Sequence, residues 1–230
     1  MKVTTMTGIF ELAVFDIAGT TVEDRDFVSN SFIEAFTRSG ISITSEEIRP
    51  LMGYRKREAI AIMLERKLDA INESHVDILH ESFVQIMTEF YLVSPHVSKM
   101  SYAEDIFHAC KQRKITVALN SGFPKIVVDA IMERTGWLRN GLVDHAIASD
   151  EVPAGRPHPY MINKLMYISG VSNSESVIKI GDTVVDILEG RNASCGKVVA
   201  VTTGAEQADM LKQYDPDFLI HSLDELRDII

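Results

Sequence analysis

The 230-residue chain contains only two cysteines, Cys110 and Cys195, and neither lies in a pattern typical of metal ligands. Two isolated thiols disfavour the disulfide framework of small secreted proteins and indicate a reducing compartment. The chain also has no apolar run long enough to cross a bilayer, and residues 1–10 lack the apolar core of a signal peptide. We therefore expect a cytoplasmic protein without a membrane segment.

Basic residues are in the minority, because 23 Lys and Arg stand against 33 Asp and Glu, which gives a formal net charge of −10. An acidic surface argues against nucleic acids and anionic membranes as partners. Hydrophobic residues make up 46% and charged residues 24%, which is ordinary for a globular protein. A local basic pocket can still bind phosphate, so a small anionic molecule remains the expected partner.

Short apolar segments rich in Val and Ile alternate with amphipathic segments along most of the chain. Six segments predict buried strands, at 12–16, 115–120, 145–149, 177–182, 198–203 and 218–222. Helical patterns follow or separate most of them, at 123–134, 157–169, 184–194 and 205–213. This alternation predicts an α/β protein with a Rossmann-like, doubly wound parallel sheet.

Residues 23–95 interrupt the alternation, because they contain no convincing strand. Amphipathic patterns predict helices over 27–40, 55–67 and 75–93. The sequence TSEE at 44–47 has the form of a capping box that starts a helix. A stretch of about 70 residues is too long for a loop in a compact domain. We interpret it as an all-helical cap inserted into a core formed by residues 1–22 and 96–230.

Polar residues stand where three of the predicted strands end, and ligands of open α/β sheets bind beyond that edge. Asp16 is a candidate nucleophile or metal ligand. Ser121 and Gly122 precede a helix, and a hydroxyl with backbone N–H groups at a helix N-terminus suits an anion. Asp182 and Asp186 offer the hard oxygen ligands that Mg²⁺ prefers.

Each of these residues also has a structural explanation. Asp16 can cap the turn that follows its strand, and Ser121 can be a plain helix N-cap. Acids at the start of a helix are favoured by the helix dipole. Arg156, in the loop VPAGRPHPY at 152–160, can neutralise a phosphate or Asp16, or it can be a surface arginine. Each of these residues alone is a weak indication of an active site. Their occurrence together, in this order along the chain, is a stronger indication.

That order resembles the haloacid dehalogenase superfamily of phosphotransferases over most of the chain. Asp16 with Thr20 is similar to the first motif of the superfamily, and Ser121 to the second. Asp182 with Asp186 looks like its acidic motif. The predicted helices after the first motif look like the helical cap of the superfamily, which also implies that the cap can form a homodimer.

The resemblance implies roles for these residues. Asp16 would attack phosphorus and form an aspartyl-phosphate. Asp16, the backbone carbonyl of Ala18 and Asp182 would bind Mg²⁺, with Asp186 in support. Ala18 is unusual, because many phosphoryl-transfer enzymes carry a second carboxylate at this position, which protonates the leaving group.

The phosphonatase branch of the superfamily accounts for this alanine. The segments DIAGTTV (16–22), VPAGRP (152–157) and GDTVVDILEGRNA (181–193) are similar to that branch. It carries a lysine shortly after a Met-Gly pair, and here Lys56 follows Met52 and Gly53. The resemblance assigns substrate or phosphate binding to Thr20, Met52, Gly53, Ser121 and Gly122.

Phosphonatases cleave the P–C bond of phosphonoacetaldehyde, and the resemblance implies this reaction for that substrate or a related 2-oxoalkylphosphonate. A lysine imine accepts the electrons of the departing carbon, so the leaving group needs no acid at Ala18. Composition alone favours a solvated Lys56 beside Arg55 and Arg57, and the alanine at position 18 reverses that preference.

Three positions depart from the phosphonatase pattern. Ala59 replaces a histidine, Phe123 replaces an aromatic hydroxyl and Asp26 replaces a cysteine. These changes affect the substrate pocket, so a second hypothesis is a phosphatase of small phosphate esters in which Lys56 acts only through its charge. A third hypothesis is a binding or scaffold protein without turnover, which the retained set of polar residues argues against.

Overall fold

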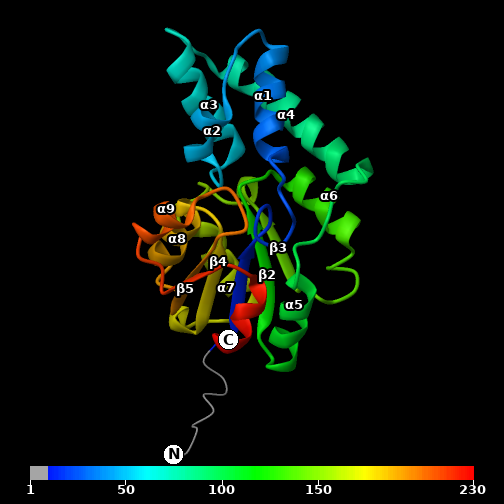
Figure 1. The fold of residues 1–230 in the computed structure, drawn as a ribbon, viewed down its shortest axis with the longest axis vertical. Coiled ribbons are helices and arrows are strands. Elements are labelled where there is room, and N and C mark those ends of the chain that lie inside the picture. Colours follow the sequence, from blue (N-terminus) through cyan, green and yellow to red (C-terminus); the bar gives the residue numbers. More distant parts are fainter. Residues whose placement is uncertain (1–9) are drawn as a thin grey trace, which may run out of the picture.

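The computed structural model describes residues 10–230, so the expected absence of a signal peptide concerns residues 1–9, which lie outside the described part. Six parallel strands form one sheet in the order β3-β2-β1-β4-β5-β6 (Figure 1). They are β1 (Leu12–Asp16), β2 (Thr116–Ser121), β3 (His145–Ala148), β4 (Val177–Gly181), β5 (Lys197–Val201) and β6 (Phe218–Ile220). All six predicted strands and the parallel sheet are confirmed. No helix among residues 10–230 is long and apolar enough to span a membrane.

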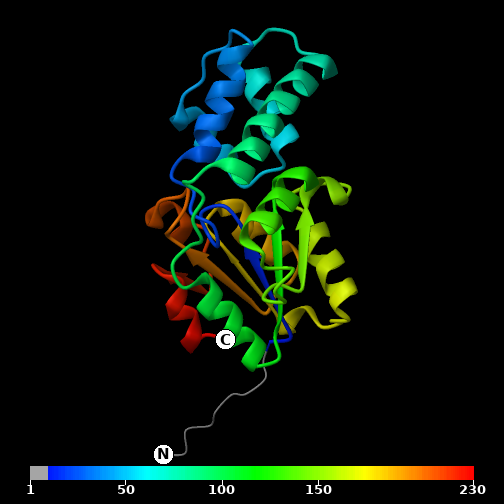
Figure 2. The same cartoon turned by 90° about the vertical axis from the view of Figure 1, so that its right-hand side faces the viewer.

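Helices cover both faces of this sheet, which confirms the predicted doubly wound α/β architecture (Figure 2). One face carries α5 (Ala103–Gln112), α6 (Lys125–Thr135) and the 3-10 helix η4 (Leu223–Asp228), and the other carries α7 (Tyr160–Ser169), α8 (Val184–Asn192) and α9 (Ala208–Lys212). Side chains alternate between the faces along a strand. Accordingly, Phe15 meets Phe107 of α5 edge to face at 5.3 Å, whereas Val14 belongs to the cluster around Leu165 of α7.

Helix α5 is absent from the sequence-based prediction. Its buried residues Ala103, Ile106, Phe107 and Cys110 have the spacing of one helical face. The missing signal is at its start, because Tyr102 at the N-cap has a left-handed backbone with φ of 67° and makes no side-chain cap. Without a capping residue, the sequence carries no start signal for this helix between the predicted cap and the next strand.

Of the five α-helices between β1 and β2 in sequence, four gather beyond the carboxyl ends of the strands (Figures 1 and 2). We call them the helical layer: α1 (Phe27–Arg38), α2 (Ser45–Ile48), α3 (Lys56–Lys67) and α4 (Glu73–Val93). The layer has its own apolar contacts, such as Phe32 against Phe83 at 4.4 Å between ring centroids. The predicted capping box is confirmed, since Thr44 and Glu47 cap α2 reciprocally.

Two connecting segments join the helical layer to the core, and they run side by side. The N–H of Glu23 donates to the carbonyl of Ser98 at 3.0 Å, and the N–H of Met100 donates to the carbonyl of Thr21 at 2.9 Å. The predicted domain boundaries, at 22/23 and 95/96, fall in or next to these segments. Whether the layer is a separate domain stays a prediction.

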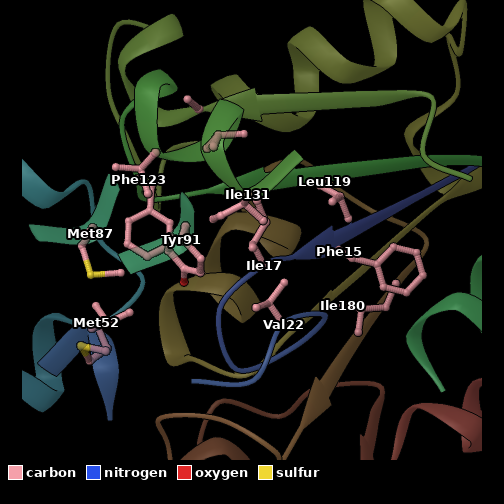
Figure 3. Close-up of a cluster of buried hydrophobic side chains, with 14 of the residues drawn as sticks. Phe15, Ile17, Val22, Met52, Met87, Tyr91, Leu119, Phe123, Ile131 and Ile180 are labelled. Carbon is pink, nitrogen blue, oxygen red and sulfur yellow. The ribbon is translucent and has the colours of Figure 1, made fainter. Parts of the chain in front are cut away.

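The helical layer also touches the core around the loops that follow β2 and β3. The backbone N–H of Lys56 donates to the carbonyl of Gly122 at 3.1 Å, and the Arg55 guanidinium donates to the carbonyls of Val152 and Pro153 at 3.0 and 3.2 Å. Figure 3 shows the apolar side of this contact, where Tyr91 of α4 lies beside Phe123, with ring centroids 5.9 Å apart. The layer therefore sits directly on the end of the sheet where the predicted site residues stand.

Gly122 allows the tightest part of this contact, which leads to a first prediction. A Cβ at this position would lie 2.2 Å from the carbonyl oxygen of Tyr54 and 2.7 Å from that of Gly53. Because backbone atoms cannot move aside cheaply, we expect Gly122→Ala to loosen the layer from the core. Limited proteolysis under native conditions should then cut the connecting segments several times faster than in the unchanged protein.

Gly141→Ala is the matched control. Its Cβ would meet nothing within 4 Å, so it carries only the strain of its φ of 70°, about 1 kcal/mol. It should unfold at a slightly lower temperature and leave the cleavage of the connecting segments unchanged. A Gly122→Ala protein as resistant to proteolysis as the unchanged chain would contradict the role of Gly122.

Candidate active site

Asp16 ends β1 and pairs with Asn120 of β2 in the sheet register. Its carboxylate is held by Arg156, which is only 1% exposed and donates from Nη1 to Asp16 Oδ1 at 2.6 Å. The same guanidinium donates from Nη2 to the backbone oxygen and the side-chain oxygen of Asn120, at 2.7 and 2.6 Å. Arg156 therefore fixes Asp16 at the sheet edge, and the alternative of a surface arginine does not apply.

A second group of buried charged residues, Lys179 and Glu189, adjoins Arg156. Its Nε donates to Glu189 of α8 at 3.0 Å, and Asn120 donates to both oxygens of Glu189 at 2.9 Å. Lys179, in the middle of β4, lies 2.9 Å from Asp186 and 3.2 Å from Glu189. Neither Lys179 nor Glu189 was predicted, and the available signal was a lysine inside the otherwise apolar strand VIKIG.

Asp182 follows β4 and points into the same region. Its Oδ1 accepts a hydrogen bond from the Thr20 hydroxyl at 2.9 Å, and its Oδ2 accepts one from the N–H of Ala205 at 2.7 Å. Burial raises the pKa of Asp182 well above its usual value, and the negative charges of Asp16 and Asp186 raise it further. Burial also raises the pKa of Asp16, against the lowering effect of Arg156. Asp16 thus has Arg156 as a cationic partner, whereas Asp182 forms no ion pair among residues 10–230.

Asp186 has a different environment from the other two acids. Burial acts to raise its pKa, but Arg156 and Lys179 bring the pKa below the usual value. Its Oδ1 lies 3.0 Å from Arg156 Nη1, and its Oδ2 accepts a hydrogen bond from the Thr183 hydroxyl at 2.5 Å. Asp186 is therefore a candidate for holding these cations in place rather than for direct contact with a metal.

The charges of this buried cluster do not balance. It combines four carboxylates with two cations, 4 negative against 2 positive, which leaves a formal charge of −2: Asp16, Asp182, Asp186 and Glu189 against Arg156 and Lys179. A divalent cation offsets such an excess, and carboxylate and carbonyl oxygens are the donors that Mg²⁺ takes. In the described part of the chain, no three His, Cys, Asp or Glu side chains are placed to share a metal. A Mg²⁺ ion here would rely on two carboxylates together with carbonyl and water oxygens.

Lys56 begins α3 and turns its side chain inward, leaving it only 4% exposed. Its ammonium lies 5.2 Å from the ring centroid of Phe123 and 5.6 Å from that of Phe32. Burial lowers the pKa of Lys56 to about 8, although Asp16 and Asp24 act in the opposite direction. Within residues 10–230 it forms no ion pair, so it is not the solvated surface lysine of the alternative reading.

One small pocket between the core and the helical layer brings most of the predicted residues together. Predicted residues that line it are Asp16, Ala18, Met52, Gly53, Lys56, Ser121, Gly122 and Asp182. Three predicted residues lie behind it and act on the lining, namely Thr20, Arg156 and Asp186. The lining also contains residues that were not predicted for it: Asp24, Val28, Thr183 and Ala205.

The three departures from the phosphonatase pattern occupy different places. Phe123 lines the pocket and packs against Tyr91, so an aromatic ring is retained there without its hydroxyl. Ala59 is buried one turn after Lys56 on α3. Asp26 is exposed before α1 and does not line this pocket.

Relatives with known names share this sequence pattern. A family model described as haloacid dehalogenase-like hydrolase matches residues 13–201. A phosphonoacetaldehyde hydrolase of Bacillus cereus is 30% identical over 207 residues, which cover 85% of this chain and 77% of the relative. Another from Bacillus anthracis is 29% identical over 231 residues, which cover 94% and 86%.

Solved structures share the fold at lower sequence identity. A phosphonoacetaldehyde hydrolase-like protein from Oleispira antarctica superimposes with a TM-score of 0.84 at 23% identity, covering 97% of this chain and 92% of its own. A predicted phosphoglycolate phosphatase from Haemophilus somnus gives a TM-score of 0.77 at 18% identity, with coverage of 96% and 97%. With a family match over most of its length, the chain belongs to the haloacid dehalogenase-like hydrolases.

Proposed function

We propose that the chain is a Mg²⁺-dependent, phosphonatase-like hydrolase. Its substrate would be phosphonoacetaldehyde or a related 2-oxoalkylphosphonate, and the bond it cleaves would be the P–C bond. One observation carries this proposal: the buried amine of Lys56 and the carboxylate of Asp16 line the same small pocket. A nucleophile for phosphorus and an amine for an adjacent carbonyl are the two groups that this reaction needs.

In the proposed reaction, Lys56 first condenses with the carbonyl of the substrate and releases water. Asp16 then attacks phosphorus, so that an O–P bond forms and the P–C bond breaks. The electron pair of the P–C bond forms the C=C bond of an enamine, and the C=N pair returns to the Lys56 nitrogen. Protonation of the enamine carbon and hydrolysis of the imine release the aldehyde, and hydrolysis of the aspartyl-phosphate releases phosphate.

Surrounding groups support each of these steps. Ser121 and Gly122 precede α6 and would hold the phosphonate oxygens with a hydroxyl and backbone N–H groups. Arg156 keeps the Asp16 carboxylate in one orientation through its hydrogen bond of 2.6 Å. Ala18 fits a leaving group that departs as an enamine, since no acid is needed beside the nucleophile. Met52 and Gly53 would contact the substrate from the side of the helical layer.

The residues present fit a Mg²⁺ ion. Asp16, the carbonyl of Ala18 and Asp182 would hold it, because all three line the pocket and the buried cluster behind them carries more negative than positive charge. When bound, the ion would offset the negative charge shared by the nucleophile and the phosphonate. Thr20 and the N–H of Ala205 keep both oxygens of Asp182 in place, and Asp186 supports the site from behind through Arg156.

The helical layer would act as the predicted cap, with residues 1–22 and 96–230 forming the core and residues 23–95 the cap. Lys56 and Met52 reach the pocket from this layer, and Asp16 and Asp182 reach it from the sheet. A reaction that needs both sides would proceed only when they are together, which also keeps water from the imine. A homodimer formed through the cap stays a prediction.

A second candidate is a phosphatase of small phosphate esters with good leaving groups. The observation in its favour is the pKa of Lys56, which at about 8 leaves most of the amine protonated at neutral pH. In that case Lys56 would attract the phosphate through its charge and form no imine. The two candidates share Asp16 and Mg²⁺, and they differ only in the chemistry of Lys56.

The nucleophile gives the second prediction. We expect Asp16→Asn to abolish phosphate release from oxo-phosphonates and from esters, because an amide oxygen is a poor nucleophile. The protein should keep a cooperative thermal unfolding transition. Asp129→Asn is the control, since it makes the same change in an exposed ion pair with Lys125 and should leave phosphate release unchanged. Near-normal turnover by Asp16→Asn would remove Asp16 from the mechanism.

The third prediction separates the two candidates at Lys56. If an imine forms, Lys56→Arg should lose P–C cleavage as completely as Lys56→Ala, because arginine keeps the charge and cannot condense with a carbonyl. Borohydride with an oxo-phosphonate should inactivate the unchanged protein and leave an adduct that mass spectrometry maps to Lys56. Lys67→Arg, on the same helix, is the control and should stay active. An active Lys56→Arg protein would favour the phosphatase.

The fourth prediction uses the pKa of Lys56. Only the neutral amine can attack a carbonyl, and burial brings the pKa of Lys56 to about 8. The kcat/KM for P–C cleavage should therefore rise with pH, about tenfold per pH unit below that pKa, and level off above it. Hydrolysis of a phosphate ester by the same preparation should lack this rise. Parallel pH profiles for the two substrates would contradict an imine route.

A further inference from the structure

Asp24 lines the pocket and has no role in the proposed reaction. Asp24 lies in the connecting segment between β1 and α1 and lines the pocket together with Asp16 and Lys56. It is half-buried, and its negative charge acts on the amine of Lys56. It also lines an adjoining cavity that contains Arg49 and Asp26, so it stands where the pocket meets the outside.

Condensation of an amine with a carbonyl needs a group that moves protons. The ammonium must lose a proton before it attacks, and the carbinolamine must gain one before its hydroxyl leaves as water. Asp16 is held by Arg156 and is reserved for phosphorus. Both oxygens of Asp182 accept hydrogen bonds, from Thr20 and from the N–H of Ala205. Neither carboxylate is free to serve Lys56.

One of the two carboxylate oxygens of Asp24 is available to a ligand. Its Oδ1 accepts a hydrogen bond from the N–H of Val28 at 2.9 Å, and this bond anchors the side chain at the start of α1. The backbone N–H of Phe27 also lies near enough to lower the pKa of Asp24, and no side chain in the range 10–230 donates a hydrogen bond to Oδ2. The anchored oxygen fixes the direction of the side chain, and the second oxygen remains available to a substrate or a water molecule.

The acidities of the two groups suit a proton exchange. Burial raises the pKa of Asp24 to about 6, against the lowering effects of the Val28 N–H and of Lys56. With Lys56 at about 8, the two values lie far closer than the roughly 6.5 units that separate a free lysine from a free aspartate. The other ionisable groups around Asp24 are Asp26 on its own segment, Tyr91 from α4 and Arg49 in the adjoining cavity.

We propose that Asp24 is the proton-transfer residue for imine formation at Lys56. Lys56 and Asp24 form no ion pair among the described residues, so the Asp24 carboxylate takes a proton from the Lys56 ammonium through a water molecule in the pocket that both line. This transfer frees the amine to attack the carbonyl carbon. The protonated Asp24 then gives that proton to the hydroxyl of the carbinolamine. The C–O bond breaks, water leaves, and the positively charged imine and the ionised carboxylate remain. This inference rests on the proposed function, because it requires the imine.

Imine formation can be tested without P–C cleavage. Acetaldehyde serves as the probe, and the initial rate of the borohydride-trapped adduct at Lys56 is measured by mass spectrometry. We expect Asp24→Asn to slow this rate about 100-fold, the usual size of a general acid–base contribution. Asp26→Asn is the matched control, since it removes the same charge two residues away from an exposed side chain outside the pocket, and its rate should stay within about twofold.

A purely structural role of Asp24 would give a different result. Asn keeps an acceptor for the N–H of Val28, and Asp24→Ser keeps a helix cap but cannot exchange a proton at this pH. Both variants should unfold at the temperature of the unchanged protein. Slow trapping that appears only together with a lower unfolding temperature in both variants would overturn the proposal.

The remaining outcomes separate this inference from the proposed function. If the unchanged protein forms the adduct at Lys56 and Asp24→Asn forms it equally fast, Asp24 has no part in proton transfer. If the unchanged protein forms no adduct at Lys56, the imine route fails and the role of Asp24 fails with it. If trapping depends on Asp24 but no oxo-phosphonate is cleaved, the inference holds and the assignment of the P–C bond is wrong.

Discussion

The buried guanidinium of Arg156 is the interaction on which the rest of the site depends. It binds the last residue of β1, the side chain and backbone of Asn120 on β2, and Glu189 on α8. A cation removed from water is tolerated only when several acceptors surround it, and here carboxylates on two sides supply them. The position of Asp16 is therefore set by three separate elements, and a shift in any one of them would move the carboxylate.

The charges around Arg156 affect both the stability of the fold and the chemistry proposed for the site. The cluster around Arg156 is more negative than positive, and its carboxylates at Asp16 and Asp182 are held at raised pKa values by burial. Burying an excess of negative charge opposes folding, and a cation that binds the folded form would stabilise it. If Mg²⁺ binds here as proposed, the carboxylates that hold the ion are the same ones whose burial opposes folding.

The sequence predicted the sheet well for a physical reason. Parallel strands buried on both faces appear as continuous apolar runs, and those runs can be read without knowledge of the partners. The same reasoning missed Lys179, because its partner Asp186 becomes a neighbour only after a strand and a helix start have been placed. Glu189 was missed for a similar reason, since its partner Asn120 is 69 residues away. Asp24 was missed because a carboxylate just before a helix looks like a cap, and here it is also part of the pocket.

The two segments that connect the helical layer to the core form one paired connection. Residues 21–23 are hydrogen-bonded to residues 98–100, so a displacement of one segment is transmitted to the other. This connection is also bonded to the end of β1, since the Thr21 hydroxyl donates to the carbonyl of Asp16 at 2.9 Å. If Lys56 and Asp16 act together as proposed, a break in this paired connection would disturb the amine and the nucleophile at the same time.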